Sequence, residues 1–172
     1  MMNKPELLYH GSLYKQDELM PGFKRSGELV MWDGIESNQY LYATSSEKDA
    51  SYLGIGSAIE KLFDSDRYAT VDRDITIYCQ NNIDKSDILK MVVYVYTIPF
   101  RDSDKWIKNN NPHNSIDTEW ITKNTIHDVT VRKLDIGEFL KGARLTVTKA
   151  PVDVDPLNIM SQYRSVTERY LF

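Results

Sequence analysis

Hydrophobic and polar positions along this chain of 172 residues are patterned mainly for β-structure. Short runs rich in aromatic and β-branched residues are separated by clusters of Gly, Pro, Asn and Asp. Such runs, several of them alternating, are typical of strands, and the clusters are typical of turns. Strands are predicted at residues 6–12, 38–44, 75–79, 90–99, 118–122, 128–136 and 145–150. The segment 90–99 is apolar on both faces at its centre, which predicts a central place in a sheet.

Two segments have the spacing of helices. Thr44 and Glu47 form the T-x-x-E pattern that starts a helix over residues 47–63. The apolar stripe of this helix consists of Tyr52, Ile55, Ile59 and Phe63. A last helix is predicted to begin at Pro156, after Asp155 as N-cap, and to include Tyr163 and Tyr170.

Two long segments, 13–37 and 101–117, have neither pattern and are expected to be irregular. Loops as long as 101–117 are uncommon in compact domains and are often functional.

Length and composition fit one globular domain over residues 1–172, of α+β class. The net charge of -4 argues against a protein built to hold polyanions. Cys79 is the single cysteine, which excludes an intramolecular disulfide and a cysteine-based zinc site. We find no signal peptide and no apolar run near the roughly 20 residues of a membrane span. The expectation is therefore a cytoplasmic protein without membrane contact, although a toxin exported by a dedicated machine would look the same.

Candidate chemistry lies in three motifs that are weak singly but informative in this order. They are Tyr9-His10-Gly11-Ser12, then Leu41-Tyr42-Ala43-Thr44 followed by Asp49-Ala50-Ser51-Tyr52, and finally Glu119-Trp120. Together they resemble the His–Tyr–Glu branch of the ADP-ribosyltransferase superfamily, which includes diphtheria toxin and the poly-ADP-ribose polymerases. The resemblance covers roughly residues 7–135 and leaves 136–172 as an extension. It implies two packed, mainly antiparallel sheets with flanking helices and an NAD cleft between the sheets.

The resemblance also implies a role for each matching residue toward NAD⁺. His10 would bind the adenosine ribose, and the backbone of Gly11 would hold the nicotinamide carboxamide. Tyr42 would stack on the nicotinamide ring, Tyr52 would form the other wall, and Glu119 would be the catalytic carboxylate. Tyr40 lies on the same strand face as Tyr42, so the two tyrosines are alternatives for stacking.

Two further residues are candidate cofactor contacts. Ser12 completes the first motif. Arg25 is a candidate contact for the pyrophosphate, although a solvated basic turn is the favoured interpretation of this residue. Lys105, Trp106 and Lys108 precede the glutamate, where the family has its target-recognition loop, and are expected to contact the target.

These residue types suit the chemistry of NAD⁺ cleavage. The glycosidic bond breaks through an oxocarbenium-like transition state, and a preorganised carboxylate can lower such a barrier by about 3–4 kcal/mol. Tyrosine faces attract the cationic nicotinamide by about 0.5–2 kcal/mol each. The mechanism needs no metal.

The function expected from the resemblance is mono-ADP-ribosylation of a macromolecule with release of nicotinamide. A protein acceptor is favoured, with nucleic acid as an alternative. The motifs themselves leave the acceptor undecided, because Asp117 at minus two from Glu119 is typical of arginine-modifying branches whereas His10 is not. An intracellular toxin or effector, which would have an antitoxin or immunity protein as partner, and a phage-encoded modifier are both compatible roles. Alternatives are an NAD glycohydrolase and a catalytically silent binding module. RNA 2′-phosphotransferase is disfavoured because its arginine and histidine set has no counterpart.

Overall fold

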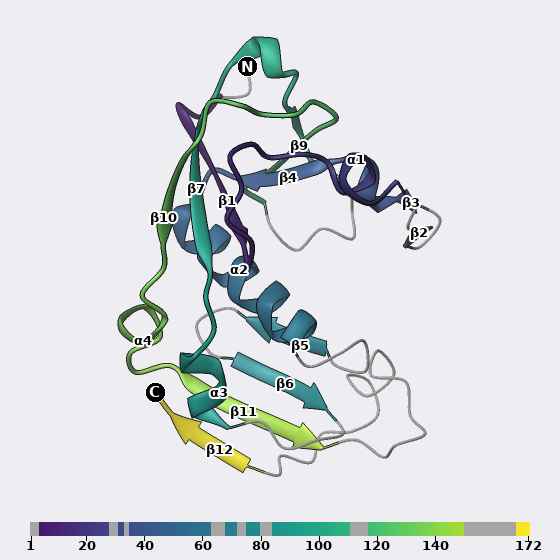
Figure 1. Cartoon of the computed structure of the whole chain (residues 1–172). Helices are drawn as coiled ribbons and strands as arrows, with labels where there is room; N and C mark the ends of the chain where they lie inside the picture. Colours follow the sequence, from purple (N-terminus) through teal and green to yellow (C-terminus); the bar gives the residue numbers. More distant parts are fainter. Residues whose placement is uncertain are drawn as a thin grey trace.

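The computed structural model describes residues 4–27, 31–32, 35–62, 68–71, 75–79, 84–110, 117–149 and 168–172. This part of the chain is α+β, and its largest element is a six-stranded antiparallel sheet in the order β10-β7-β1-β4-β9-β8. The strands are β1 (Leu7–Ser12), β4 (Leu41–Thr44), β7 (Tyr94–Pro99), β8 (Ile107–Lys108), β9 (Glu119–Thr122) and β10 (Thr130–Lys133). In Figure 1, β7 and β1 run down the picture whereas β4 runs across it.

Strand β7 has the central place that its apolar centre predicts. It pairs with β1 on one edge and with β10 on the other. Its residues Val95, Tyr96 and Ile98 are almost completely buried, so both faces of the strand are covered. The prediction for this segment is confirmed, although the strand itself begins at Tyr94.

The helix α2 (Glu47–Leu62) covers one face of the sheet by packing against β1 and β7. Ser46, not Thr44, caps it: the Ser46 hydroxyl accepts from the Asp49 N–H at 3.2 Å, and its carbonyl accepts from the Ala50 N–H. Thr44 stays in β4, where its hydroxyl accepts from the Ser46 N–H at 3.1 Å. The predicted helix is therefore confirmed, but its cap lies two residues later.

Two apolar clusters form on opposite faces of the sheet. The first lies between α2 and the sheet and includes Tyr52, Ile55, Ile59, Val93 and Val95. The second contains Leu8, Leu41, Tyr96, Trp106 and Trp120. Adjacent residues of β1 and β7 enter different clusters because successive side chains of a strand point to opposite faces.

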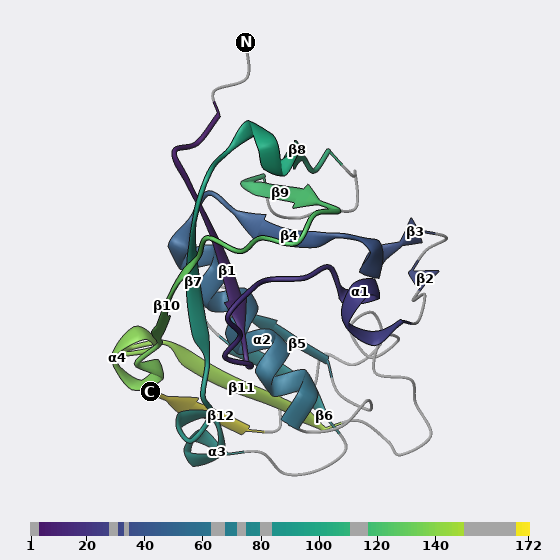
Figure 2. The ribbon, with the colours of Figure 1, turned by 45° about the horizontal axis from the view of Figure 1, so that its top comes forward.

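Four more strands lie beyond α2, in the order β12-β11-β6-β5. They are β5 (Tyr68–Val71), β6 (Ile75–Cys79), β11 (Arg144–Lys149) and β12 (Glu168–Leu171), and β11 pairs in parallel with β6. Helix α2 packs against β5 as well as β1, and Figure 2 shows it between the two groups of strands.

The predicted C-terminal helix is wrong where the structure describes the chain. Tyr170 lies in β12 and pairs with Leu145 of β11. Pairing with β11 supplies the backbone hydrogen bonds and overrides the local pattern. Residues 155–166, on which the start of that helix was predicted, lie outside the described residues.

Short elements interrupt the segments expected to be irregular, and a 3-10 helix covers the first residues of the strand predicted at 38–44. Two further short helices were not predicted. These short elements are α1 (Gly22–Ser26), β2 (Met31–Trp32), β3 (Ile35–Glu36), η1 (Ser37–Gln39), α3 (Lys85–Leu89), η2 (Asp102–Asp104) and α4 (Ile136–Phe139). Asp84 and Asp135 cap α3 and α4 through their side chains. Among the described residues, no helix has both the length and the apolar character that a membrane span requires.

Candidate functional site

Tyr9-His10-Gly11-Ser12, Leu41-Tyr42-Ala43-Thr44 and Glu119-Trp120 lie on three neighbouring strands, β1, β4 and β9, although Glu119 is 75 residues beyond Thr44 in the chain. Asp49–Tyr52 of the second motif lie on α2. Tyr9 of β1 is opposite Thr44 of β4, and Thr44 is opposite Glu119 of β9. The sheet therefore brings the first motif, the second motif and the glutamate to one level.

Strands β1 and β4 separate directly after this level. Within the described residues, their ladder contains the single pair Tyr9 and Thr44. The next residue of β1, His10, bridges the diverging strands by its side chain, with Nδ1 at 2.7 Å from the carbonyl oxygen of Tyr42. A side chain thus replaces backbone pairing at the point where the strands open.

The hydrogen bond of His10 determines its tautomer. Burial lowers the pKa of His10, the carbonyl of Tyr42 raises it, and the positive charge of Arg25 lowers it. The net shift is downward, so the imidazole is neutral at neutral pH. A carbonyl can only accept, so Nδ1 carries the proton and Nε2 carries the lone pair. His10 thus offers an acceptor, and Arg25 lies near enough for its charge to act on the ring.

Glu119 is a buried carboxylate with an amide partner. Its exposed fraction is 9%. Burial raises the pKa of Glu119, whereas a hydrogen bond from Asn109 and the charge of Lys108 lower it. The Asn109 side-chain amide donates to Oε1 of Glu119 at 2.5 Å. The upward shift is typical of a carboxyl group at a functional site.

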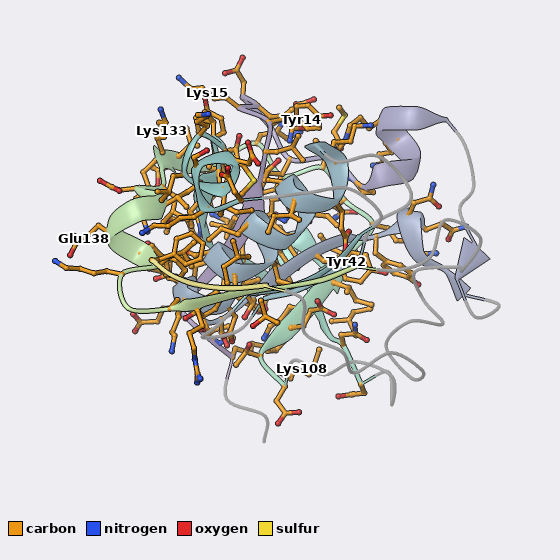
Figure 3. All side chains as sticks on the ribbon, turned by 90° about the horizontal axis from the view of Figure 1, so that it is seen from below. Tyr14, Lys15, Tyr42, Lys108, Lys133 and Glu138 are labelled. Carbon is orange, nitrogen blue, oxygen red and sulfur yellow. The ribbon has the colours of Figure 1, made fainter. Side chains whose placement is uncertain are left out.

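Tyr42 shares the electrostatic environment of Glu119. Burial raises the pKa of the half-buried Tyr42 phenol, and the charges of Glu119 and then Tyr40 raise it further. The Tyr40 ring meets Tyr42 edge-on at 6.5 Å and lies under the ammonium of Lys123 at 5.0 Å. The charge of Glu119 thus acts on the Tyr42 phenol. Figure 3 shows Tyr42 well apart from Lys15, Lys133 and Glu138.

A hydroxyl network holds the start of β9 against α2. The hydroxyls of Thr44 and Thr118 are 2.6 Å apart, and Thr118 donates to the Asp49 carboxylate at 2.9 Å. The Ser45 N–H donates to the Thr118 carbonyl. Because Thr118 directly precedes Glu119, this network positions the glutamate relative to the second motif.

Three residues assigned to NAD⁺ by resemblance have other contacts in the structure. Tyr52 is 8% exposed, and its ring packs edge-on against Phe139 at 4.9 Å in the first apolar cluster. Gly11 faces α2 so closely that an added Cβ would lie 1.9 Å from the carbonyl oxygen of Ala50. The buried Ser12 hydroxyl accepts from the Tyr14 N–H. The structure therefore links His10 to the charge of Arg25 and to the backbone of Tyr42. Tyr42 in turn lies within reach of the Glu119 charge, whereas Tyr52 lies in the first apolar cluster.

The loop before Glu119 departs from the expectation for target contacts. Trp106 is 8% exposed in the second apolar cluster, so it is a core residue and not a surface contact. The Lys108 ammonium donates to the Asp117 carbonyl and lies 5.6 Å from the centre of the Trp120 ring. Lys105 is exposed, and Ile107, which the sequence did not single out, is 61% exposed.

Asn109 is the site residue that sequence reasoning missed. Its position in an asparagine-rich stretch indicated only a loop. The signal lies in the pairing of β8 with β9, which depends on tertiary structure.

Comparisons of the chain with models of protein families, with characterised proteins and with solved structures found no significant match.

Proposed function

We propose that this protein is an NAD⁺-dependent mono-ADP-ribosyltransferase with an ADP-ribosyltransferase-like fold. The observation that carries the proposal is the convergence of His10, Tyr42 and Glu119 from three separate motifs onto neighbouring strands. Each motif is weak alone. Their adjacency in the sheet is an observation separate from the sequence resemblance.

Glu119 is the catalytic carboxylate in this proposal. As the bond between ribose and nicotinamide breaks, positive charge develops on the ribose, and a carboxylate bound to its 2′-hydroxyl stabilises that charge. Burial strengthens the effect because less water screens the interaction. The same carboxylate can orient the incoming nucleophile.

His10 and Arg25 are assigned to the adenosine half of NAD⁺. The neutral imidazole presents Nε2 as an acceptor for a ribose hydroxyl, since its Nδ1–H donates to the Tyr42 carbonyl. Arg25 lies close enough to influence His10 and would offer its guanidinium to the pyrophosphate. Tyr42, beside Glu119, would stack on the cationic nicotinamide.

The acceptor in this proposal is a protein side chain. The exposed Lys105 and Ile107 lie on the segment that leads into Glu119 and would contact it. An intracellular effector role, in which a neutralising partner blocks the same site, would follow from such an activity.

The test is turnover of labelled NAD⁺ by the purified chain in a cell lysate, compared with Glu119→Gln. We expect wild type to release nicotinamide and label macromolecules, and the variant to lose about 10²–10³-fold in turnover with NAD⁺ binding retained. Glu138→Gln is the matched control, because Glu138 is an exposed carboxylate well apart from Tyr42 in Figure 3.

A folding defect in the Glu119 variant would be visible in its stability. Because the folded state raises the pKa of Glu119, it binds the proton more tightly than the unfolded chain. Stability therefore falls as the pH rises from the ordinary pKa of a glutamate through the raised pKa of Glu119, and replacing the charge by an amide should not lower stability at neutral pH.

Nicotinamide release without labelled macromolecules would favour the glycohydrolase instead. Absence of NAD⁺ binding would refute both enzymes and leave a binding module.

A further inference from the structure

Asn109 and Glu119 are cross-strand neighbours held by backbone and side chain together. The Asn109 N–H donates to the Glu119 carbonyl at 3.0 Å, which extends the ladder of Lys108 with Trp120 by one residue. The two side chains therefore leave the sheet on the same side, and the amide meets Oε1 at 2.5 Å. Two bonds from one residue fix the position of Asn109 before any substrate binds.

The chemical character of this contact suits a carboxylate that must act as an anion. A primary amide donates a hydrogen bond without adding charge, so it favours the ionised carboxylate and leaves the local net charge negative. A lysine in this place would neutralise the charge that the oxocarbenium ion needs. Lys108, the cation next to Asn109 in sequence, also lowers the pKa of Glu119 through its charge, but it donates its hydrogen bond to the Asp117 carbonyl.

The contact also distinguishes the two carboxylate oxygens of Glu119. Among the described residues, the side-chain hydrogen bond of Glu119 is made through Oε1. Rotation of the carboxylate would break it, so the amide holds one rotamer. With Oε1 held by Asn109, a ligand of Glu119 would be bound through Oε2.

We infer that Asn109 is a positioning residue, which fixes the Glu119 carboxylate through Oε1 so that Oε2 can receive the ribose 2′-hydroxyl. The inference rests on the proposed function and adds to it a residue outside the motifs of the resemblance. It predicts that Asn109 acts on Glu119 and not on NAD⁺ directly.

The test compares Asn109→Leu, which removes the donor at similar volume, with Asn109→Asp, which replaces it by a like charge. We expect kcat for nicotinamide release to fall about 10- to 100-fold, with a KM for NAD⁺ within about threefold of wild type. The acidic limb of the kcat profile should move upward by about one pH unit in Asn109→Leu and further in Asn109→Asp. Asn110→Asp is the matched control, since Asn110 is exposed and one residue away, and should behave as wild type.

A second measurement does not depend on turnover. Carbon-13 labelling of glutamate carboxyl groups, with the Glu119 signal assigned by Glu119→Gln, reports the titration of Glu119 directly. An upward shift in both Asn109 variants supports the contact, whereas an unchanged titration overturns the inference even if turnover falls. If wild type releases nicotinamide and the Asn109 variants match it in kcat and pH profile, the inference alone fails. If wild type releases none, the proposed function fails and the inference with it.

Discussion

Burial controls the protonation of two residues of the candidate site. It lowers the pKa of His10 and so keeps the imidazole neutral at neutral pH. Burial raises the pKa of Glu119, and the hydrogen bond from Asn109 lowers it. The neutral imidazole of His10 and the hydrogen-bonded carboxylate of Glu119 suit a substrate with ribose hydroxyls and a developing positive charge.

The state of His10 has a consequence for stability. Because the folded state lowers the pKa of His10, the unfolded chain binds the proton first as the pH falls below about 6.5. The folded state therefore loses stability in that range, with a slope of up to about 1.4 kcal/mol per pH unit from this residue. Urea unfolding between neutral and mildly acidic pH should show a flatter dependence in His10→Gln. An unchanged slope in His10→Gln would contradict burial of a neutral imidazole.

At the scale of elements, the contact between β1 and α2 explains two glycines. Gly54 is unfavourable in a helix by its propensity alone, yet its Cα lies against Gly11, and an added Cβ would be 2.7 Å from Val93. The two glycines let the helix approach the strand that carries His10. The packing of α2 therefore supports the site without supplying a side chain to the group of His10, Tyr42 and Glu119.

Substitution of these glycines should measure that contact. Gly54→Ala is expected to lower the free energy of unfolding by about 1–3 kcal/mol through overpacking. Gly11→Ala should cost more, because its Cβ would meet backbone atoms that cannot move aside. Gly137→Ala is the control, since its Cβ would have ordinary contacts at 3.6 Å and 3.7 Å. Denaturant unfolding distinguishes them, and equal stability of Gly11→Ala and Gly137→Ala would contradict the close approach.

At the scale of the whole molecule, the candidate site and the main apolar core are separate. The first cluster joins α2, α4 and the sheet, and Tyr52 packs with Phe139 within it. Tyr42, by contrast, is half-buried beside the charge of Glu119. The two tyrosines that the resemblance treats as a pair therefore have different surroundings.

Substitution of each tyrosine by leucine should separate a role in packing from a role in NAD⁺ binding. Tyr52→Leu should lower the free energy of unfolding by about 1–3 kcal/mol, because the aromatic pair and its packing are lost. Its KM for NAD⁺ should stay near wild type. Tyr42→Leu should raise that KM about 3- to 30-fold, through loss of stacking on the cationic ring. A high KM with unchanged stability in Tyr52→Leu would restore it as a wall of the nicotinamide slot.

Local pattern by itself determined the strands that became β1, β4, β6, β7, β9, β10 and β11, the helix α2 and the central place of β7. These depend on alternation, helical spacing and turn residues, which are properties of neighbours in the chain. Only the tertiary structure decided that Tyr170 lies in a strand, that Trp106 is a core residue, and that Asn109 holds Glu119. Those outcomes depend on strand pairing and burial between distant residues. The residue types of the site could thus be read from the chain, whereas their charge states and partners required the fold, because desolvation and hydrogen bonding are set by what surrounds a side chain in space.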